Sequence, residues 1–307
     1  LALRAAVDPP PKKTFPVGSS GIEARTEDAM KEGRPSTTAE AVAFWRALEQ
    51  HYPAERRVLD DPWAHHFLTR YTRTLLKLNR NPWLISQSDH TFGLGTMVYT
   101  VLRHRWMDLT FEGAEGPFEQ VLILGAGYDM RAFRLNFGDA QIFEIDHPAT
   151  GGRKARKVAA LGRPDPVHRI SVDFSKEDLS HALERSGFQK GRKSWFFWEG
   201  VSMYLPEAAV RSTLSVLSSW GCEGVLDLYA PLEHPGLGGF YRRTLPRVVE
   251  IVGEPVDFLI RPEHGEAFAR ELGFRVQALA THRDLQQLSP RPAAPNESGW
   301  LMHLIPS

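Results

Sequence analysis

Several features are scarce in this chain of 307 residues, and each scarcity excludes a class of protein. Cys222 is the only cysteine, so an internal disulfide framework is excluded and a reducing compartment is favoured. Its place beside an apolar run predicts a buried, unreactive thiol. No apolar run reaches the roughly 20 residues of a membrane-spanning helix, and charges and prolines interrupt the first residues where a signal peptide would be apolar. We therefore expect a soluble, cytoplasmic protein that does not bind membranes.

The chain also lacks net charge and an obvious metal site. Lys plus Arg and Asp plus Glu both total 37, whereas binding to nucleic-acid phosphates depends on an excess of basic residues. A nucleic-acid partner is therefore not expected, and the basic run at 153–157 is interpreted as a solvated helix face. The adjacent His65 and His66 have no third ligand at metal spacing, so no metal is predicted.

Composition divides the chain into three parts. Residues 1–35 are rich in Pro, Gly, Ser and charge, which predicts a flexible N-terminal arm. Residues 36–118 carry helical patterns and are interpreted as a helical cap. Residues 119–307 are expected to form the core domain, in which 231–265, rich in Gly and Pro, is interpreted as an insertion or lid over one edge of the sheet.

Seven apolar runs of the C-terminal part have the length and composition of β-strands. They are 120–124, 141–145, 169–172, 194–198, 224–229, 274–279 and 300–305. Helical patterns separate the first five, which predicts parallel strands joined by crossover helices. Between Asp284 and Trp300 no convincing helical pattern lies, so the last two runs are expected to form a closing hairpin. The predicted fold class is α/β: a doubly wound, seven-stranded, Rossmann-like sheet with a helical N-terminal cap.

The sharpest local motif is Gly125-Ala126-Gly127, directly after the first apolar run. Glycines allow a strand to turn sharply into a helix while a ligand approaches the backbone. The amides at the start of that helix favour an anionic or electron-rich group. Because a Gly-x-Gly motif is weak evidence alone, the residues at the ends of the next strands decide how it is interpreted.

Acidic residues stand at those strand ends. Asp146 ends the second run, about 20 residues after the glycines, where a carboxylate can accept hydrogen bonds from both hydroxyls of a ribose. Asp173 and Phe174 follow the third run, and they suit the edge and the face of an adenine. Ligands of open α/β sheets bind at the carboxyl ends of the strands. An adenosine-containing cofactor is therefore predicted.

Two enzyme classes fit these features, nicotinamide-dependent dehydrogenases and S-adenosylmethionine-dependent methyltransferases. The dinucleotide fingerprint requires Gly or Ala at its sixth position, where this chain has Met130. Asp129 just before it is poorly placed against a pyrophosphate but tolerable near a cationic sulfonium. The methyltransferase is therefore favoured over the NAD-dependent dehydrogenase.

Segments of the chain recur, in the same order, in a known family. They are Thr38-Ala-Glu40, Arg46-Ala-Leu-Glu49, Asp60-Asp-Pro-Trp-Ala64, Arg103-His-Arg-Trp-Met-Asp108, the stretch 121–135, Phe143-Glu-Ile-Asp-His-Pro148 and the stretch 198–206. Over about 36–230 the chain thus resembles the leucine carboxyl methyltransferase family, class I enzymes that include polyketide-pathway O-methyltransferases. It departs from the family at His104, Leu109 and Met130, none of which removes a ligand-bearing group.

The resemblance implies S-adenosyl-L-methionine as cofactor and a role for individual residues. Arg103 is expected to hold the methionine carboxylate, with Arg46 as a second candidate, because guanidinium and carboxylate groups pair in bidentate fashion. The other implied cofactor contacts are Gly125, Ala126 and Gly127 at the methionine portion, Asp146 at the ribose, Asp173 and Phe174 at the adenine, and Glu199 near the amino and sulfonium groups.

The expected reaction is O-methylation of a carboxylate or phenolic hydroxyl of a small molecule. A carboxylate is ionised at neutral pH and needs no general base, whereas a phenol benefits from one. Tyr204 and Glu199 are the catalytic candidates. The candidates for acceptor binding are Tyr229, His234, Arg242 and Arg243, the arginines because a carboxylate needs a cationic partner.

Three alternatives remain open. Some members of the resembling family methylate the C-terminal carboxylate of a protein, although no feature of this sequence identifies such a partner. A nicotinamide-dependent dehydrogenase is the second alternative, and a catalytically silent protein that binds S-adenosylmethionine is the third. The sequence does not predict the oligomeric state or the identity of the acceptor.

Overall fold

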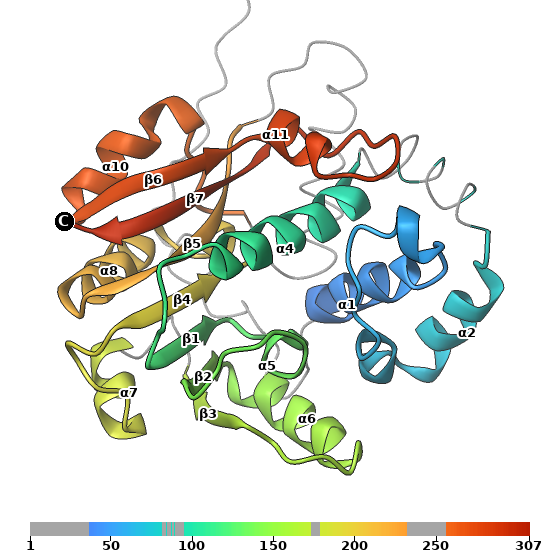
Figure 1. The fold of residues 1–307 in the computed structure, drawn as a ribbon, viewed down its shortest axis with the longest axis horizontal. Helices are drawn as coiled ribbons and strands as arrows, with labels where there is room; N and C mark the ends of the chain where they lie inside the picture. Colours follow the sequence, from blue (N-terminus) through green and yellow to red (C-terminus); the bar gives the residue numbers. More distant parts are fainter. Residues whose placement is uncertain are drawn as a thin grey trace, which may run out of the picture.

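The computed structural model describes residues 37–81, 84, 87, 89, 95–172, 179–231 and 256–307. A seven-stranded sheet crosses the fold in the order β3-β2-β1-β4-β5-β7-β6 (Figure 1). The strands are β1 (Gln120–Leu124), β2 (Gln141–Asp146), β3 (Val167–Ser171), β4 (Ser194–Trp198), β5 (Cys222–Tyr229), β6 (Phe274–Ala280) and β7 (Gly299–Pro306). The first five are parallel, and β7 runs antiparallel to its neighbours β5 and β6. The prediction of a doubly wound sheet closed by a hairpin is confirmed.

Burial along the strands follows their place in the sheet. All five residues of β1 and all five of β4, in the centre, are buried, and both strands are apolar along most of their length because helices cover both faces. The edge strand β3, with the polar sequence Val-His-Arg-Ile-Ser, has no fully buried residue. Cys222 at the start of β5 is fully buried, and burial raises the pKa of its thiol to about 12. The predicted burial of this thiol is confirmed.

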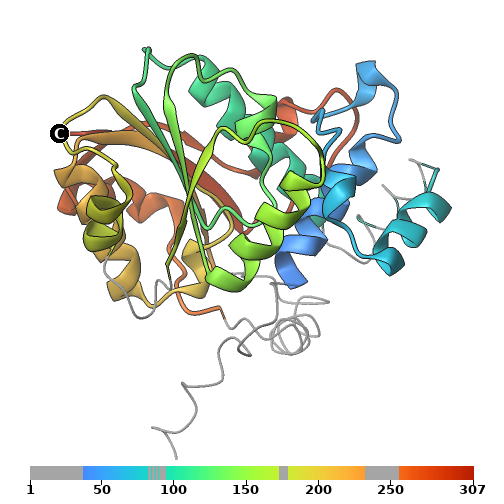
Figure 2. The same cartoon turned by 90° about the horizontal axis from the view of Figure 1, so that it is seen from below.

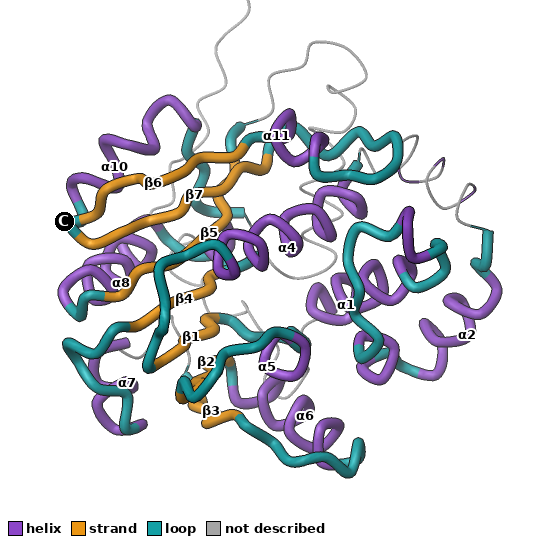
Figure 3. Tube along the Cα trace, viewed as in Figure 1, coloured by secondary structure: helices purple, strands orange, loops and turns teal. Residues whose placement is uncertain are grey.

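Helices alternate with the strands along the chain and cover the sheet on both sides (Figures 2 and 3). One apolar cluster includes α7 (Leu179–Ser186), α8 (Glu207–Ser219) and α10 (Gly265–Glu271). A second cluster, on the other face, includes α4 (Thr96–Glu112), α5 (Arg131–Arg134) and α11 (His282–Gln287). Among the described residues, no helix combines the length and the apolar character needed to cross a membrane.

Helix α11 is a correction to the expected loop after Asp284. The side chain of Asp284 accepts a hydrogen bond from the backbone N–H of Thr281, and the threonine side chain caps the first turn in return. This capping box begins a short helix, and Leu285 anchors it in the second cluster. The helix is too short for its apolar periodicity to be recognised in the sequence.

The N-terminal helices lie beyond the carboxyl ends of the parallel strands (Figure 1). They are α1 (Thr37–Glu49), η1 (Ala54–Arg56), η2 (Ala64–Phe67) and α2 (Arg70–Leu78). Ala43 and Phe67 from this group form a third apolar cluster with Tyr128 and Met130 from the segment after β1. Another helix, α6 (Pro148–Ala159), contributes Val158 to the same cluster. Met130 is therefore explained by its packing against these helices.

A buried ion pair fixes the end of α1 to the segment before β7. Both guanidinium Nη atoms of Arg291 bond to the carboxylate of Glu49, with Nη1 3.0 Å from Oε2, and the side chains are 6% and 5% exposed. The guanidinium carbon lies 3.7 Å from the ring centroid of Tyr52, and the Val58 N–H donates to Glu49. The pair thus joins two parts of the chain that are far apart in sequence.

Glu49→Ala is expected to lower the free energy of unfolding by about 3 kcal/mol, because it leaves the Arg291 guanidinium buried without its carboxylate. Urea denaturation of the variant and the wild type measures the difference. The matched control is Glu207→Ala, which breaks an exposed pair with Arg211 and should change stability little. Equal effects of the two substitutions would contradict a structural role for the buried pair.

Candidate cofactor-binding site

The turn after β1 requires glycine for two reasons. Gly125 has φ +61° and Gly127 has φ +46°, in the left-handed region that L-residues with a side chain rarely adopt. A Cβ at Gly125 would also lie only 2.2 Å from Cγ2 of Val201, in the segment after β4. Ala126 between them is buried and donates its N–H to the Ile145 carbonyl of β2 at 3.0 Å. The turn is therefore enclosed between the ends of β2 and β4.

Asp146, at the end of β2, holds this turn in place. Its Oδ2 accepts the N–H of Gly127, and its Oδ1 accepts the N–H of His147 at 2.6 Å. Burial raises the pKa of the carboxyl, and the two amide hydrogen bonds act in the opposite direction. Because each carboxylate oxygen has a second lone pair, the group retains capacity for two further donors.

A network of ion pairs connects α4 with the ends of β1, β4 and β5. Arg131, fully buried at the start of α5, is its centre. Its Nε donates to Asp108 of α4 at 2.7 Å, its Nη1 to Asp129 at 2.5 Å, and its Nη2 lies 2.6 Å from Glu199 Oε2. Its guanidinium carbon lies 4.7 Å from the ring centroid of Phe197 in β4. One side chain thus joins three structural elements.

Arg103 of α4 lies in the same network. Its Nε and Nη2 lie 3.0 and 2.9 Å from Glu199 Oε1, and its Nη1 donates to Asp227 at 2.6 Å and to the Tyr229 hydroxyl at 2.8 Å. These contacts use four of the five N–H groups of a guanidinium. Arg103 therefore lies at the carboxyl ends of β4 and β5, and its own protein ligands already orient it.

The network holds two of its acids in the ionised form. Burial opposes ionisation of Asp129, but the adjacent Arg131 outweighs it and lowers the pKa of the carboxyl. Burial opposes ionisation of Glu199 in the same way, yet His104 and the two arginines hold its pKa well below the ordinary value. The pKa of Asp227 is raised by burial, although Arg103 and the Gly200 N–H both favour its charged form.

Other predicted site residues have partners of a different kind. Arg46 of α1 donates to Asp61 at 2.8 Å and to the Tyr128 carbonyl at 2.6 Å, so it binds α1 to the segment after the glycine turn. Burial raises the pKa of Tyr229 well above its ordinary value. Tyr204 is half-buried in η3 (Ser202–Tyr204), directly after the segment that follows β4.

The remaining predicted residues lie outside the part of the chain that the structure describes. They are Asp173 and Phe174 at the adenine and His234, Arg242 and Arg243 at the acceptor. Their roles remain predictions.

Comparison with known proteins identifies the family. Residues 39–218 match the model of a family described as leucine carboxyl methyltransferase. A Mycobacterium bovis BCG protein named as an S-adenosyl-L-methionine-dependent methyltransferase is 31% identical over 230 residues, which are 70% of each chain. The chain belongs to the leucine carboxyl methyltransferase family. It is an enzyme that uses S-adenosyl-L-methionine.

Further similarities agree with this assignment. A Mycobacterium sp. KMS protein that is also named as an S-adenosyl-L-methionine-dependent methyltransferase is 34% identical over 189 residues, which are 56% of this chain and 58% of that one. A crystal structure of a methyltransferase from Thermobifida fusca superimposes with a TM-score of 0.55 at 15% identity, over 90% of this chain and 97% of that chain. The structural similarity supports the class I methyltransferase fold.

The residues at the strand ends of this methyltransferase fit its cofactor. The linked network contains four carboxylates (Asp108, Asp129, Glu199, Asp227) against three guanidinium groups (Arg103, Arg131, Arg134). The ionised carboxylates of Asp129 and Glu199 suit a ligand that carries a sulfonium and an ammonium group. The glycine turn lies at the carboxyl end of β1, and Asp146 beside it keeps lone pairs that can accept from the hydroxyls of a ribose.

Two residues that connect the elements of this site, Arg131 and Asp227, were not predicted from the sequence. Arg131 stands inside a family-like segment, but its partners come from α4, Asp129 and β4, so only the tertiary structure shows its role. Asp227 gave a recognisable signal: a charged residue inside the apolar run of β5, fully buried, needs a partner. That partner is Arg103.

His104, Asp129 and Glu199 also place three ligand atoms within 4.8 Å of one another, a spacing that a metal ion could bridge. Arg131 already bonds to both carboxylates. A cation at this position would have to share the two acids with a guanidinium. The geometry is therefore that of an ion-pair network, and the sequence prediction of no metal remains a prediction.

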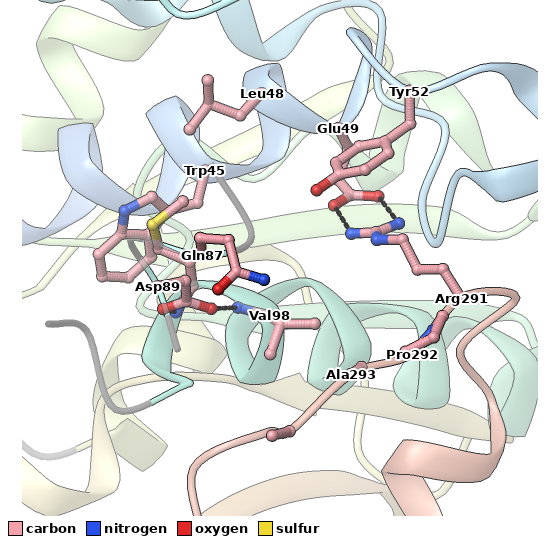
Figure 4. Close-up of a pocket in the computed structure, with 12 residues that line it drawn as sticks. Trp45, Leu48, Glu49, Tyr52, Gln87, Asp89, Val98, Arg291, Pro292 and Ala293 are labelled. Atoms are coloured by element: carbon pink, nitrogen blue, oxygen red, sulfur yellow. Dashed lines mark hydrogen bonds and ion pairs between the residues drawn. The ribbon is translucent and has the colours of Figure 1, made fainter. Parts of the chain in front are cut away.

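A cavity of about 270 Å³ lies between α1, the start of α4 and residues 291–294 (Figure 4). Trp45, Tyr52 and Met97 supply apolar walls, and the Glu49–Arg291 pair lies at one end. Met97 and Val98 line this cavity, whereas Arg103 points to the strand ends. Because its guanidinium is paired with Glu49, Arg291 does not offer an unpaired cation to a carboxylate ligand.

Gly125→Ala tests the glycine turn. The substitution should cost about 1–3 kcal/mol more than Gly138→Ala, because both positions have positive φ but only Gly125 faces Val201, whereas nothing lies within 4 Å of a Cβ at Gly138. Chemical denaturation measures stability, and calorimetry measures the affinity for S-adenosylhomocysteine, which should fall only in Gly125→Ala. Identical behaviour of the two variants would show that the contact with Val201 is unimportant.

Proposed function

We propose that this methyltransferase transfers a methyl group to an oxygen atom of a small acidic molecule, a carboxylate or an acidic phenol. When bound, S-adenosylmethionine supplies a methyl group already activated by its sulfonium. The protein's contribution is then alignment, exclusion of water and electrostatic support. The family description, leucine carboxyl methyltransferase, supports oxygen as the accepting atom.

The observation that carries the proposal is the pairing of Asp129 and Glu199 with Arg131, which favours their ionised forms. A carboxylate whose pKa lies below its ordinary range is a weak base, and both groups are bound to Arg131. The buried Tyr229 hydroxyl, with its pKa well raised, is a poor base at neutral pH because it stays protonated. Such a site favours an acceptor that arrives ionised, and carboxylates are ionised at neutral pH.

The proposed roles follow from position. Arg103 and Glu199 orient the methionine end of the cofactor, the glycine turn lies along it, and Asp146 binds the ribose. Tyr204 borders the acceptor side, together with the predicted residues of the 231–265 insertion. The helices of 36–118 form a cap over the strand ends, where α1 approaches the turn: a Cβ at Gly127 would lie 3.5 Å from that of Ala39.

Transfer of a labelled methyl group to a panel of acceptors tests the proposal. The panel contains small aromatic and aliphatic carboxylic acids, phenols, and a peptide ending in leucine. Methyl esters release methanol in mild base and phenolic methyl ethers do not, so the product identifies the accepting group. Turnover of small acids with no labelling of the peptide is the expected result. Labelling of the peptide alone would contradict a small-molecule acceptor.

The ribose contact has its own prediction. Asp146→Asn should weaken S-adenosylhomocysteine binding by about 1.5–3 kcal/mol, because it removes a charged acceptor. The loss should be smaller for the 2′,3′-dideoxyribose analogue, which has no hydroxyls to donate, because for that ligand only the weakened hold on the glycine turn remains. Calorimetry measures both ligands on both proteins. A loss of equal size for the two ligands would mean that Asp146 acts only through the glycine turn.

A further inference from the structure

His104 is a buried imidazole whose second nitrogen has no protein partner. It follows Arg103 on α4 and is 2% exposed. Its Nδ1 lies 2.9 Å from Oε2 of Glu199, while its Nε2 has no hydrogen-bond partner among the described residues. A buried polar atom without a partner is costly, so this nitrogen points to a ligand.

The neighbours of His104 determine which nitrogen carries the proton. Glu199 is ionised and can only accept, so Nδ1 carries a hydrogen and donates it. Burial and the adjacent Arg131 lower the pKa of the imidazole below its ordinary value, which keeps the ring neutral at pH 7. In this tautomer Nε2 carries no hydrogen and can only accept a hydrogen bond.

A second acceptor faces the same space. Oδ1 of Asp129 lies 3.8 Å from Nε2 of His104. A single donor with two or more hydrogens can bond to both acceptors at this separation, and an ammonium group has three. The ionised carboxylates of Asp129 and Glu199, both close to His104, favour a cationic donor over water.

We propose that Nε2 of His104, together with Asp129, accepts hydrogen bonds from the α-ammonium group of bound S-adenosylmethionine. The inference rests on the proposed placement of the methionine end of the cofactor at this network. It makes His104 a binding residue that distinguishes ligands with an amino group from those without one.

The test compares S-adenosylhomocysteine with its analogue that lacks the α-amino group, by calorimetry on the full chain. His104→Asn keeps an amide donor near the position of Nδ1 and deletes Nε2. It should weaken the binding of S-adenosylhomocysteine about 10- to 100-fold and leave the affinity for the desamino analogue nearly unchanged. His104→Gln, whose amide reaches the position of Nε2, should recover part of the preference for the amino group.

The matched control is His303→Asn. His303 is also buried and pairs with Glu223 at 2.9 Å, but Glu223 stands near the beginning of β5 and Tyr229 ends that strand at the site. The control should not change the ratio of the two affinities. Thermal unfolding of all variants shows which of them are folded.

The pH dependence gives a second readout. His104 faces Glu199 at the end of β4, Asp129 after β1, Arg131 of α5 and Asp108 of its own helix. Protonation of Nε2 would repel the ammonium, so affinity for S-adenosylhomocysteine should be constant above the lowered pKa and fall as the pH drops through it. His104→Asn should lose this dependence, and the desamino analogue should show little of it with wild-type protein.

The outcomes separate the inference from the proposed function. Failure of the wild type to bind S-adenosylhomocysteine would overturn the cofactor placement. If the wild type binds S-adenosylhomocysteine and the desamino analogue with equal affinity, the role of His104 is overturned but the cofactor is not. The same conclusion follows if His104→Asn loses affinity for both ligands equally. Unchanged affinities with a lost kcat would also overturn this role, and would make His104 a general base.

Discussion

The structure depends on the burial of Arg131 among three carboxylates from different elements. Its guanidinium binds Asp108 of α4, Asp129 after the glycine turn and Glu199 at the end of β4. A buried ion-pair network is costly to desolvate and strongly destabilising to break. The network therefore fixes the position of α4 against the strand ends. Arg103 and His104, which point from α4 into the site, take their places from that docking.

The same constraint explains how this enzyme separates binding from proton transfer. Asp129 and Glu199, whose pKa values Arg131 helps to lower, remain ionised and are weak bases near neutral pH. They instead provide a fixed negative field at the carboxyl ends of the strands, where a sulfonium cofactor is stabilised without reorganisation of the protein. These two acids therefore do not deprotonate the acceptor, which is why a carboxylate or an acidic phenol, which ionises without their help, is the proposed substrate.

The sequence predicted the sheet well because its central strands are continuous apolar runs, and helical patterns separate the parallel ones. The positions of Gly125, Asp146, Glu199 and Arg103 followed from the rule for strand ends and from the resemblance. Partners could not be predicted: Arg46 binds Asp61 and a backbone carbonyl, and Arg103 already has two carboxylates and a tyrosine. Those contacts join residues up to 126 positions apart, and they exist only after α1 and α4 have packed on the strand ends.

The central claim is that the ion-pair network binds the methionine end of the cofactor. The most direct measurement compares the dissociation constants of S-adenosylmethionine and 5′-methylthioadenosine, which lacks the amino and carboxylate groups, in the wild type and in Arg103→Ala. Substitution of a buried arginine also affects folding, so the ratio of the two constants is the informative quantity. The account predicts that Arg103→Ala weakens the binding of S-adenosylmethionine far more than the binding of methylthioadenosine. Equal losses for both ligands would show that Arg103 only supports the fold, and would contradict the claim.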